Sequence, residues 1–128
     1  MPTLMEVVSK DPELPAGIDG ISLLPTLLGQ DQPERPYLYR EFSGYGGQQT
    51  IRVGDWKAVR QNMTKGNLEI ELYDMANDIG ETNDVAADHP DVVAKLAKMM
   101  REVRTPSDVF PLIPLDKPVA GKKRGKSK

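Results

Sequence analysis

Residues 50–60, TIRVGDWKAVR, decide the fold of this chain because they specify a tight β-hairpin. Two short runs that carry apolar residues flank Gly54 and Asp55, and a two-residue loop with glycine in its first position is typical of a type II′ turn. Pairing across this turn places two cross-strand pairs on one face, which we expect to be buried: Val53 with Trp56, and Ile51 with Ala58.

Two further strands are expected beside this hairpin. Residues 37–42, YLYREF, and residues 68–74, LEIELYD, alternate apolar and polar side chains as half-buried strands do. Glycine-rich residues 43–47, SGYGG, and turn-forming residues 62–67, NMTKGN, separate these segments from the hairpin. The sequence therefore predicts four antiparallel strands joined in a meander.

A well-marked helix follows the predicted sheet. Asp88 is the expected N-cap, Pro90 falls in the first turn, and Asp91 lies near the positive end of the helix dipole. Apolar residues then recur at helical spacing and predict a stripe that packs on the sheet: Val92, Val93, Leu96, Met99, Met100 and Val103.

Two short helical segments precede the sheet. Residues 2–9, PTLMEVVS, predict a short amphipathic helix with proline in its first turn. Residues 22–29, SLLPTLLG, offer one or two apolar turns between a serine cap and a glycine stop. The sequence thus predicts an α+β fold, in which a four-stranded antiparallel sheet is packed by a C-terminal helix and preceded by short N-terminal helices.

The composition bounds what the chain can do. Its 128 residues suit one domain, and 38% hydrophobic residues permit a modest core. The absence of cysteine excludes disulfides, thiolate metal sites and a cysteine nucleophile. No apolar run approaches the length of a membrane span, and residues 1–20 lack the basic leader and apolar region of a signal peptide. Residues 117–128 hold six of the 17 basic residues and no acidic one, so the tail is basic and the body acidic.

Three local motifs fall short of a catalytic, metal or nucleotide site. The single histidine, His89, has no accompanying nucleophile signature, so we expect it to belong to the start of the helix. Residues 74–84 are rich in acids but place Ile79 where an EF-hand loop requires glycine, and we expect Asx turns there instead. Residues 44–47, GYGG, lack the lysine of a phosphate loop, which leaves a mobile loop or a close backbone approach, with room for a substrate role.

The order of five segments resembles the C-terminal portion of a type I sulfatase of the arylsulfatase family. These segments are PTLMEVV, GIDGISLLPTLLG, YLYREF, GGQQTIRVGDWKAVR and ELYDMANDIGETNDVAADHPDVVAKL, and the resemblance covers nearly residues 1–110. It implies that residues 1–36 are the end of the large sulfatase domain with a connecting segment. Residues 37–110 would be the C-terminal subdomain, and residues 111–128 a proline-containing basic tail, expected to be disordered. Ile79 departs from the family, which usually has proline there.

The same resemblance implies that the catalytic half lies upstream. There the family carries C-x-P-S-R, whose cysteine or serine becomes formylglycine, and the Asp and Asn ligands of calcium. This chain contains no cysteine and no S-x-P-S-R. We therefore expect no catalytic or metal-binding residue here, no activity of the chain alone, and calcium and formylglycine only in the missing N-terminal half. Met1 would correspond to an internal position, which suggests a truncated or split reading frame, and the parent would be periplasmic or secreted.

In this family the loop that enters the central hairpin often reaches the substrate. The corresponding residues 41–49, EFSGYGGQQ, predict a pocket rim made of Glu41, Tyr45, Gly46, Gly47, Gln48 and Gln49. The expected partners are the sulfatase catalytic domain and a sulfated carbohydrate, with no nucleic acid and no membrane. The alternative is a free-standing, non-catalytic module that binds an anionic carbohydrate or a protein partner. A sulfatase N-terminal half encoded immediately upstream would distinguish the first interpretation from the second.

Overall fold

The computed structural model describes residues 2–9, 13, 16, 18, 20–112 and 115–116. It divides into two compact units, Met1–Arg35 and Pro36–Lys128. The first unit contains helices α1 (Pro2–Val8) and α2 (Leu24–Leu27), in agreement with the two short helices predicted from the sequence. None of the described helices is long and apolar enough to cross a membrane.

Hydrogen bonds at the start of α2 and between this start and α1 explain the form of the first unit. The hydroxyl of Ser22 accepts a hydrogen bond from the Leu24 amide at 3.1 Å, and Gly29 ends the turn at a φ of +71°. The Leu23 amide donates to the Thr3 hydroxyl at 2.9 Å and so ties α2 to α1. Several apolar side chains of this unit remain exposed: Leu4, Val7, Val8, Leu23, Leu27 and Leu28.

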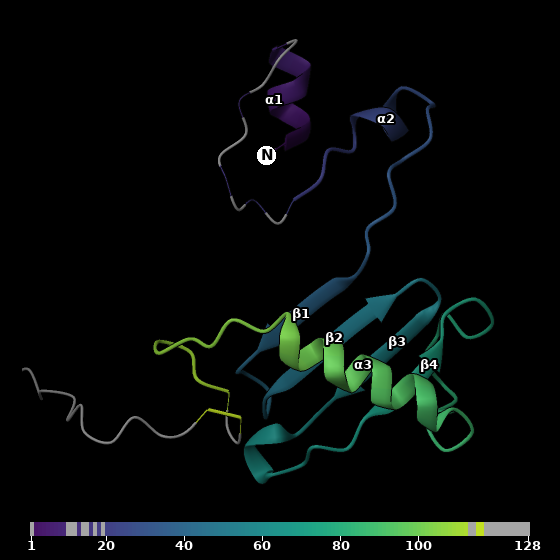
Figure 1. The fold of residues 1–128 in the computed structure, drawn as a ribbon, viewed down its shortest axis with the longest axis vertical. Coiled ribbons are helices and arrows are strands. Elements are labelled where there is room, and N and C mark those ends of the chain that lie inside the picture. Colours follow the sequence, from purple (N-terminus) through teal and green to yellow (C-terminus); the bar gives the residue numbers. More distant parts are fainter. Residues whose placement is uncertain are drawn as a thin grey trace, which may run out of the picture. The chain divides into compact units, whose positions relative to one another are not determined.

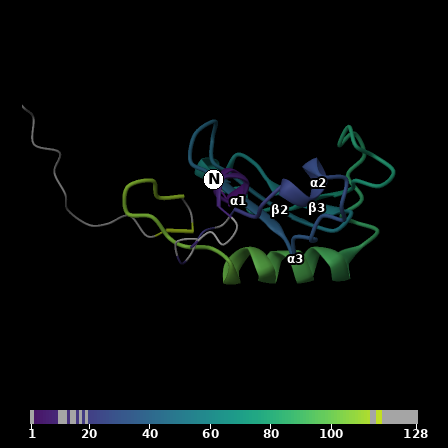
Figure 2. The same ribbon diagram turned by 90° about the horizontal axis from the view of Figure 1, so that it is seen from above.

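The second unit is a four-stranded antiparallel sheet with a helix on one face (Figures 1 and 2). Its strands follow the order β1-β2-β3-β4, so consecutive strands are neighbours, as the meander prediction requires. The elements are β1 (Leu38–Phe42), β2 (Gln48–Val53), β3 (Trp56–Arg60), the 3₁₀ turn η1 (Met63–Lys65), β4 (Glu71–Asp74) and α3 (Pro90–Glu102). This arrangement confirms the predicted α+β fold class.

The central hairpin has the predicted register. Val53 pairs with Trp56 and Ile51 pairs with Ala58. Gly54 has a φ of +57°, whereas Asp55 has no positive φ, which matches the requirement of a type II′ turn. The buried core lies between this face of the sheet and α3, and it consists of Ile51, Ala58, Leu72, Leu96 and Met100.

The fourth strand is shorter than predicted. Only Glu71–Asp74 form β4, and Leu68 is exposed. Two side chains bind backbone groups that would pair with β3 if β4 began earlier. Arg60 Nε donates to the Leu68 carbonyl at 3.1 Å, and the Glu69 amide donates to the Asn67 side-chain oxygen at 3.0 Å. These bonds occupy backbone groups of Leu68 and Glu69, and the strand begins only at Glu71.

The start of α3 also differs from the prediction. His89, and not Asp88, occupies the N-cap position, and its carbonyl accepts the first helical hydrogen bond from Val93. The His89 side chain makes no capping bond; its ring centroid lies 4.8 Å from that of Trp56. The histidine thus belongs to the helix start, as expected, and it packs on the hairpin.

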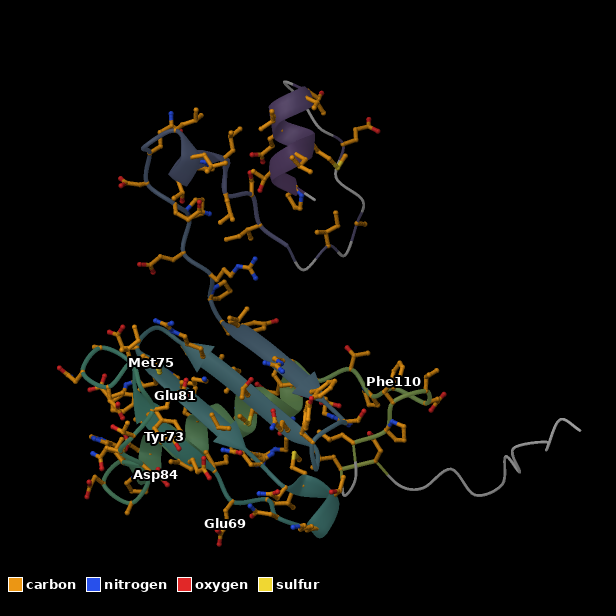
Figure 3. The ribbon with its side chains drawn as sticks, turned by 180° about the vertical axis from the view of Figure 1, so that it is seen from behind. Glu69, Tyr73, Met75, Glu81, Asp84 and Phe110 are labelled. Atoms are coloured by element: carbon orange, nitrogen blue, oxygen red, sulfur yellow. The ribbon has the colours of Figure 1, made fainter. Side chains whose placement is uncertain are left out.

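The sheet face turned away from α3 is polar near β4. Figure 3 shows Tyr73 and Glu81 on this side, the first on β4 and the second on the loop that follows. Lys57, which pairs with Tyr73 across the strands, donates a hydrogen bond to Glu81 at 2.5 Å. This ion pair ties the loop after β4 to the back of the sheet.

Candidate functional site

The loop between β1 and β2 has an unusual backbone. Three consecutive residues lie in the left-handed region: Tyr45 at a φ of +49°, Gly46 at +84° and Gly47 at +77°. Glycine adopts this conformation without steric cost, but tyrosine does not, since its Cβ approaches the following carbonyl. Strain of this kind persists only where the surroundings hold the backbone in place, and it concentrates at functional sites.

Hydrogen bonds to η1 hold this loop. The Gly46 carbonyl accepts bonds from the Thr64 amide at 2.9 Å and from the Thr64 hydroxyl at 3.0 Å. The Gly47 carbonyl accepts a bond from the Met63 amide at 3.2 Å. The predicted glycine-rich turn is therefore attached at its second half.

Close packing explains why residue 47 is glycine. A Cβ atom placed there would lie 3.1 Å from Leu112 Cδ1 and 3.3 Å from Met63 Cβ. Both neighbours are fully buried. Gly47 thus serves the close approach of two chain segments, one of the two roles that the sequence left open for these glycines.

Tyr45 and Gln48 are the predicted rim residues with accessible side chains. Tyr45 is 87% exposed, and its ring centroid lies 5.9 Å from that of Phe42. Gln48 pairs with Phe42 at the end of the β1–β2 ladder and is half-buried. A phenol ring and an amide at this edge could stack on, and hydrogen-bond to, a sugar.

Glu41 and Gln49 instead belong to a polar network inside the fold. Gln49 is 1% exposed; its Nε2 donates to the Tyr39 hydroxyl at 2.8 Å, and its Oε1 accepts from Arg60 at 2.9 Å. The Tyr39 hydroxyl donates in turn to Glu41. Burial and this bond to Glu41 raise the pKa of Tyr39 to about 12. With both amide atoms engaged, Gln49 supports the sheet in this structure.

Arg104 extends this network to the segment beyond α3. Its guanidinium donates to both carboxylate oxygens of Glu41 and to both of Asp116. The hydrogen bonds from Arg104 hold the pKa of Asp116 below its usual value, and the two acceptors raise the pKa of Arg104. Every buried side-chain nitrogen or oxygen among the described residues has a hydrogen-bond partner.

Four members of this network were not predicted from the sequence: Tyr39, Arg60, Arg104 and Asp116. The two-residue period of the strands was an available signal for part of this network. Residues 39 and 41 lie on the opposite face of β1 from residue 40, and residue 49 lies on the same face of β2 as the buried Ile51, two positions away. That periodicity places Tyr39, Glu41 and Gln49 on the inner face. No local pattern indicated Arg104 or Asp116.

The segment after Phe110 is packed at its start. Leu112 is fully buried and Asp116 is paired with Arg104, which differs from the disordered tail expected from residue 111 onward. The basic residues 117–128 lie outside the described part of the chain, as do residues 113 and 114.

Among the residues that the structure describes, no group of side chains is arranged to hold calcium, and the sequence has no motif that could become formylglycine. The sequence contains neither cysteine nor an S-x-P-S-R motif from which the aldehyde could form. Within the described residues no cluster of three or more His, Cys, Asp or Glu side chains could hold a metal ion. The acidic segment 74–84 forms Asx turns as predicted: Asp74 accepts from the Ala76 amide, and Asp84 accepts from the Ala86 amide.

Comparison with known proteins gives a consistent set of relatives. No family model matches the chain. It is 32% identical to the N-acetylgalactosamine-6-O-sulfatase of Bacteroides thetaiotaomicron over 70% of its own length, but it spans only 19% of that relative. It also aligns, at 40% identity over 58 residues, with an uncharacterized sulfatase of Schizosaccharomyces pombe, of which it spans 10%.

Two solved structures share the fold over 79% of the chain. One is a 6S-sulfatase from a Bacteroides thetaiotaomicron locus for the metabolism of multiple glycosaminoglycans, with a TM-score of 0.58 and 30% identity. The other is a protein in complex with its substrate D-glucosamine-2-N,6-O-disulfate, with a TM-score of 0.62 and 25% identity. The chain covers 23% and 22% of these structures, so it spans about a fifth of their length.

Proposed function

The chain is related to a C-terminal portion of sulfatases, and on this premise we propose that it forms the small subdomain that borders the substrate pocket of a sulfatase. The observation that carries this proposal is the loop of residues 43–47. Its second half is bonded to η1, while Tyr45 stands exposed at a positive φ. Binding residues lie disproportionately on loops that a rigid scaffold positions, and strained backbone clusters at functional sites.

In this proposal the chain recognises substrate and carries out no bond cleavage. Its partner is the catalytic portion of the sulfatase, which would supply formylglycine and calcium. The Tyr45 ring would stack on a sugar next to the sulfate ester, and the Gln48 amide would hydrogen-bond to a hydroxyl or sulfate oxygen. The names of two relatives, an N-acetylgalactosamine-6-O-sulfatase and a protein bound to a disulfated glucosamine, favour a sulfated amino sugar as the substrate class.

The test uses the chain joined to the catalytic portion of its sulfatase. Tyr45→Ala and Gln48→Ala are compared with the parent on a sulfated amino-sugar oligosaccharide and on a small aryl sulfate. We expect the ratio of the two kcat/KM values to change by a factor that corresponds to roughly 1–3 kcal/mol of transition-state stabilisation. The reason is that only the larger substrate reaches the rim. Tyr37→Ala, an exposed tyrosine outside the loop, is the matched control and should leave the ratio unchanged.

Two results would overturn this proposal. If both loop variants match the parent on every substrate, the loop is only a connection between strands. If the 128-residue chain alone binds a sulfated oligosaccharide tightly, and the same variants abolish that binding, a free-standing binding module is favoured instead. The isolated chain should hydrolyse no sulfate ester, with or without added calcium.

A further inference from the structure

The end of the described chain lies against one end of the β1–β2 loop and is linked to the other end through Arg104. Leu112 packs against Gly47, which closes the loop, and a Cβ at Gly47 would lie 3.1 Å from Leu112 Cδ1. Asp116 pairs with Arg104, which also holds Glu41, the residue before the last position of β1. We infer that Leu112 and Asp116 form a clamp that positions this loop, and that Arg104 transmits the contact from Asp116 to Glu41.

The clamp has its own internal structure. The Leu112 amide donates to Asp116 Oδ2 at 2.7 Å, and the Leu112 carbonyl accepts bonds from the Leu115 and Asp116 amides at 2.9 and 3.0 Å. Asp116 therefore orients the leucine and binds Arg104 with the same carboxylate. Loss of its charge would weaken both contacts together, because charge-assisted bonds are about twice as strong as neutral ones.

The clamp lies apart from the main core. The cluster between the sheet and α3 contains Ile51, Ala58, Leu72, Leu96 and Met100, but neither Leu112 nor Met63, although both of these are fully buried. We therefore expect the clamp and the loop to open at a lower free energy than the sheet, as a local unfolding unit. A role in positioning the loop is thus separable from a role in global stability.

Hydrogen exchange on the full 128-residue chain tests this inference directly. The amides of Met63 and Thr64 donate to the loop carbonyls of Gly47 and Gly46, so their protection reports attachment of the loop. In Asp116→Asn and in Leu112→Ala we expect these two amides to exchange about tenfold faster or more, while amides of the β2–β3 ladder keep their rates. Asp108→Asn, at an exposed position of the same segment, is the control and should change neither set.

Two outcomes would overturn the clamp. If Asp116→Asn accelerates all protected amides equally, the segment serves global stability only. If neither variant changes the exchange of Met63 and Thr64, the segment does not hold the loop. Asp116→Asn removes no volume, so it provides a result even if Leu112→Ala fails to fold.

The consequence for catalysis rests on the proposed function and is measured separately. In the complete sulfatase, Asp116→Asn should raise KM for the sulfated amino-sugar oligosaccharide several-fold with little change in kcat for a small aryl sulfate. Faster exchange without a change in specificity would keep the clamp and reject the pocket rim. A change in specificity with Tyr45→Ala, but no change in exchange with Asp116→Asn, would keep the rim and reject the clamp.

Discussion

Arg104 and Glu41 are 63 residues apart in the sequence and form a two-pronged ion pair. Arg104 Nε donates to Oε2 at 2.9 Å and Nη2 donates to Oε1 at 3.1 Å. Their side chains are 9% and 17% exposed, so water screens the pair only partly. This pair joins the chain just after α3 to the outer strand β1.

Replacement of Arg104 by alanine should destabilise the second unit by about 2–3 kcal/mol, because it leaves two carboxylates with little solvent and no cation. Chemical denaturation followed by Trp56 fluorescence measures the loss. Arg101→Ala removes an exposed arginine from the last turn of α3 and serves as the control, with an expected change below about 0.5 kcal/mol. Equal losses in the two variants would contradict a special role for Arg104.

Gly47→Ala should lower the free energy of unfolding by more than a glycine substitution that introduces only backbone strain. Gly66 has a similar φ of +85°, and a Cβ atom added there would have nothing within 4 Å, so Gly66→Ala should cost about 1 kcal/mol. At Gly47 the same strain is joined by overlap with Leu112 and Met63, which should bring the total to about 2–4 kcal/mol. The difference in unfolding free energy between the two variants isolates the packing contribution, and its absence would show that residue 47 does not require close approach.

The stability of the fold should fall in alkali. The pKa of Tyr39 is raised to about 12, whereas a tyrosine in an unfolded chain titrates near 10. Between about pH 10 and pH 12 the folded state therefore retains a proton that the unfolded state releases, and the free energy of unfolding decreases as the pH rises. Below pH 10 the contribution is fully present.

Tyr39→Phe should remove part of this alkaline slope. Urea unfolding at several values between about pH 9 and pH 12 measures it. Tyr73→Phe should remove a further part, because burial and a hydrogen bond to Glu71 raise the pKa of Tyr73 to about 12 as well. A double variant that keeps the full slope of the parent would contradict the assignment.

The contact between His89 and Trp56 gives a test of the helix start. The tilted ring pair should contribute about 1 kcal/mol, so His89→Ala should lower the unfolding free energy by that amount and change the Trp56 emission. Asp88→Ala should have a smaller effect, since the N-cap position belongs to His89. A loss of about 1 kcal/mol from Asp88→Ala, with none from His89→Ala, would instead support Asp88 as the N-cap, as the sequence predicted.

Local rules determined the sheet and the helix. The turn at Gly54 and Asp55 and the two-residue period of the strands specify the pairing of Ile51 with Ala58, because a slip by one residue would expose the whole apolar face. The helical spacing of Leu96 and Met100 likewise specifies the face that α3 buries. Each of these features depends on residues that are close together in the chain.

Long-range contacts decided the rest. Nothing near Glu41 in the sequence indicates that its partner is Arg104, and nothing near Gly47 indicates Leu112, so neither the buried Gln49 nor the packed start of the tail was predicted. The length of β4 was also set from outside the strand, by Arg60 and Asn67. The predicted rim residues accordingly separated, with Tyr45 exposed and Gln49 inside. Periodicity specifies which face a side chain occupies, whereas the partner that satisfies a polar group is chosen only when distant segments pack together.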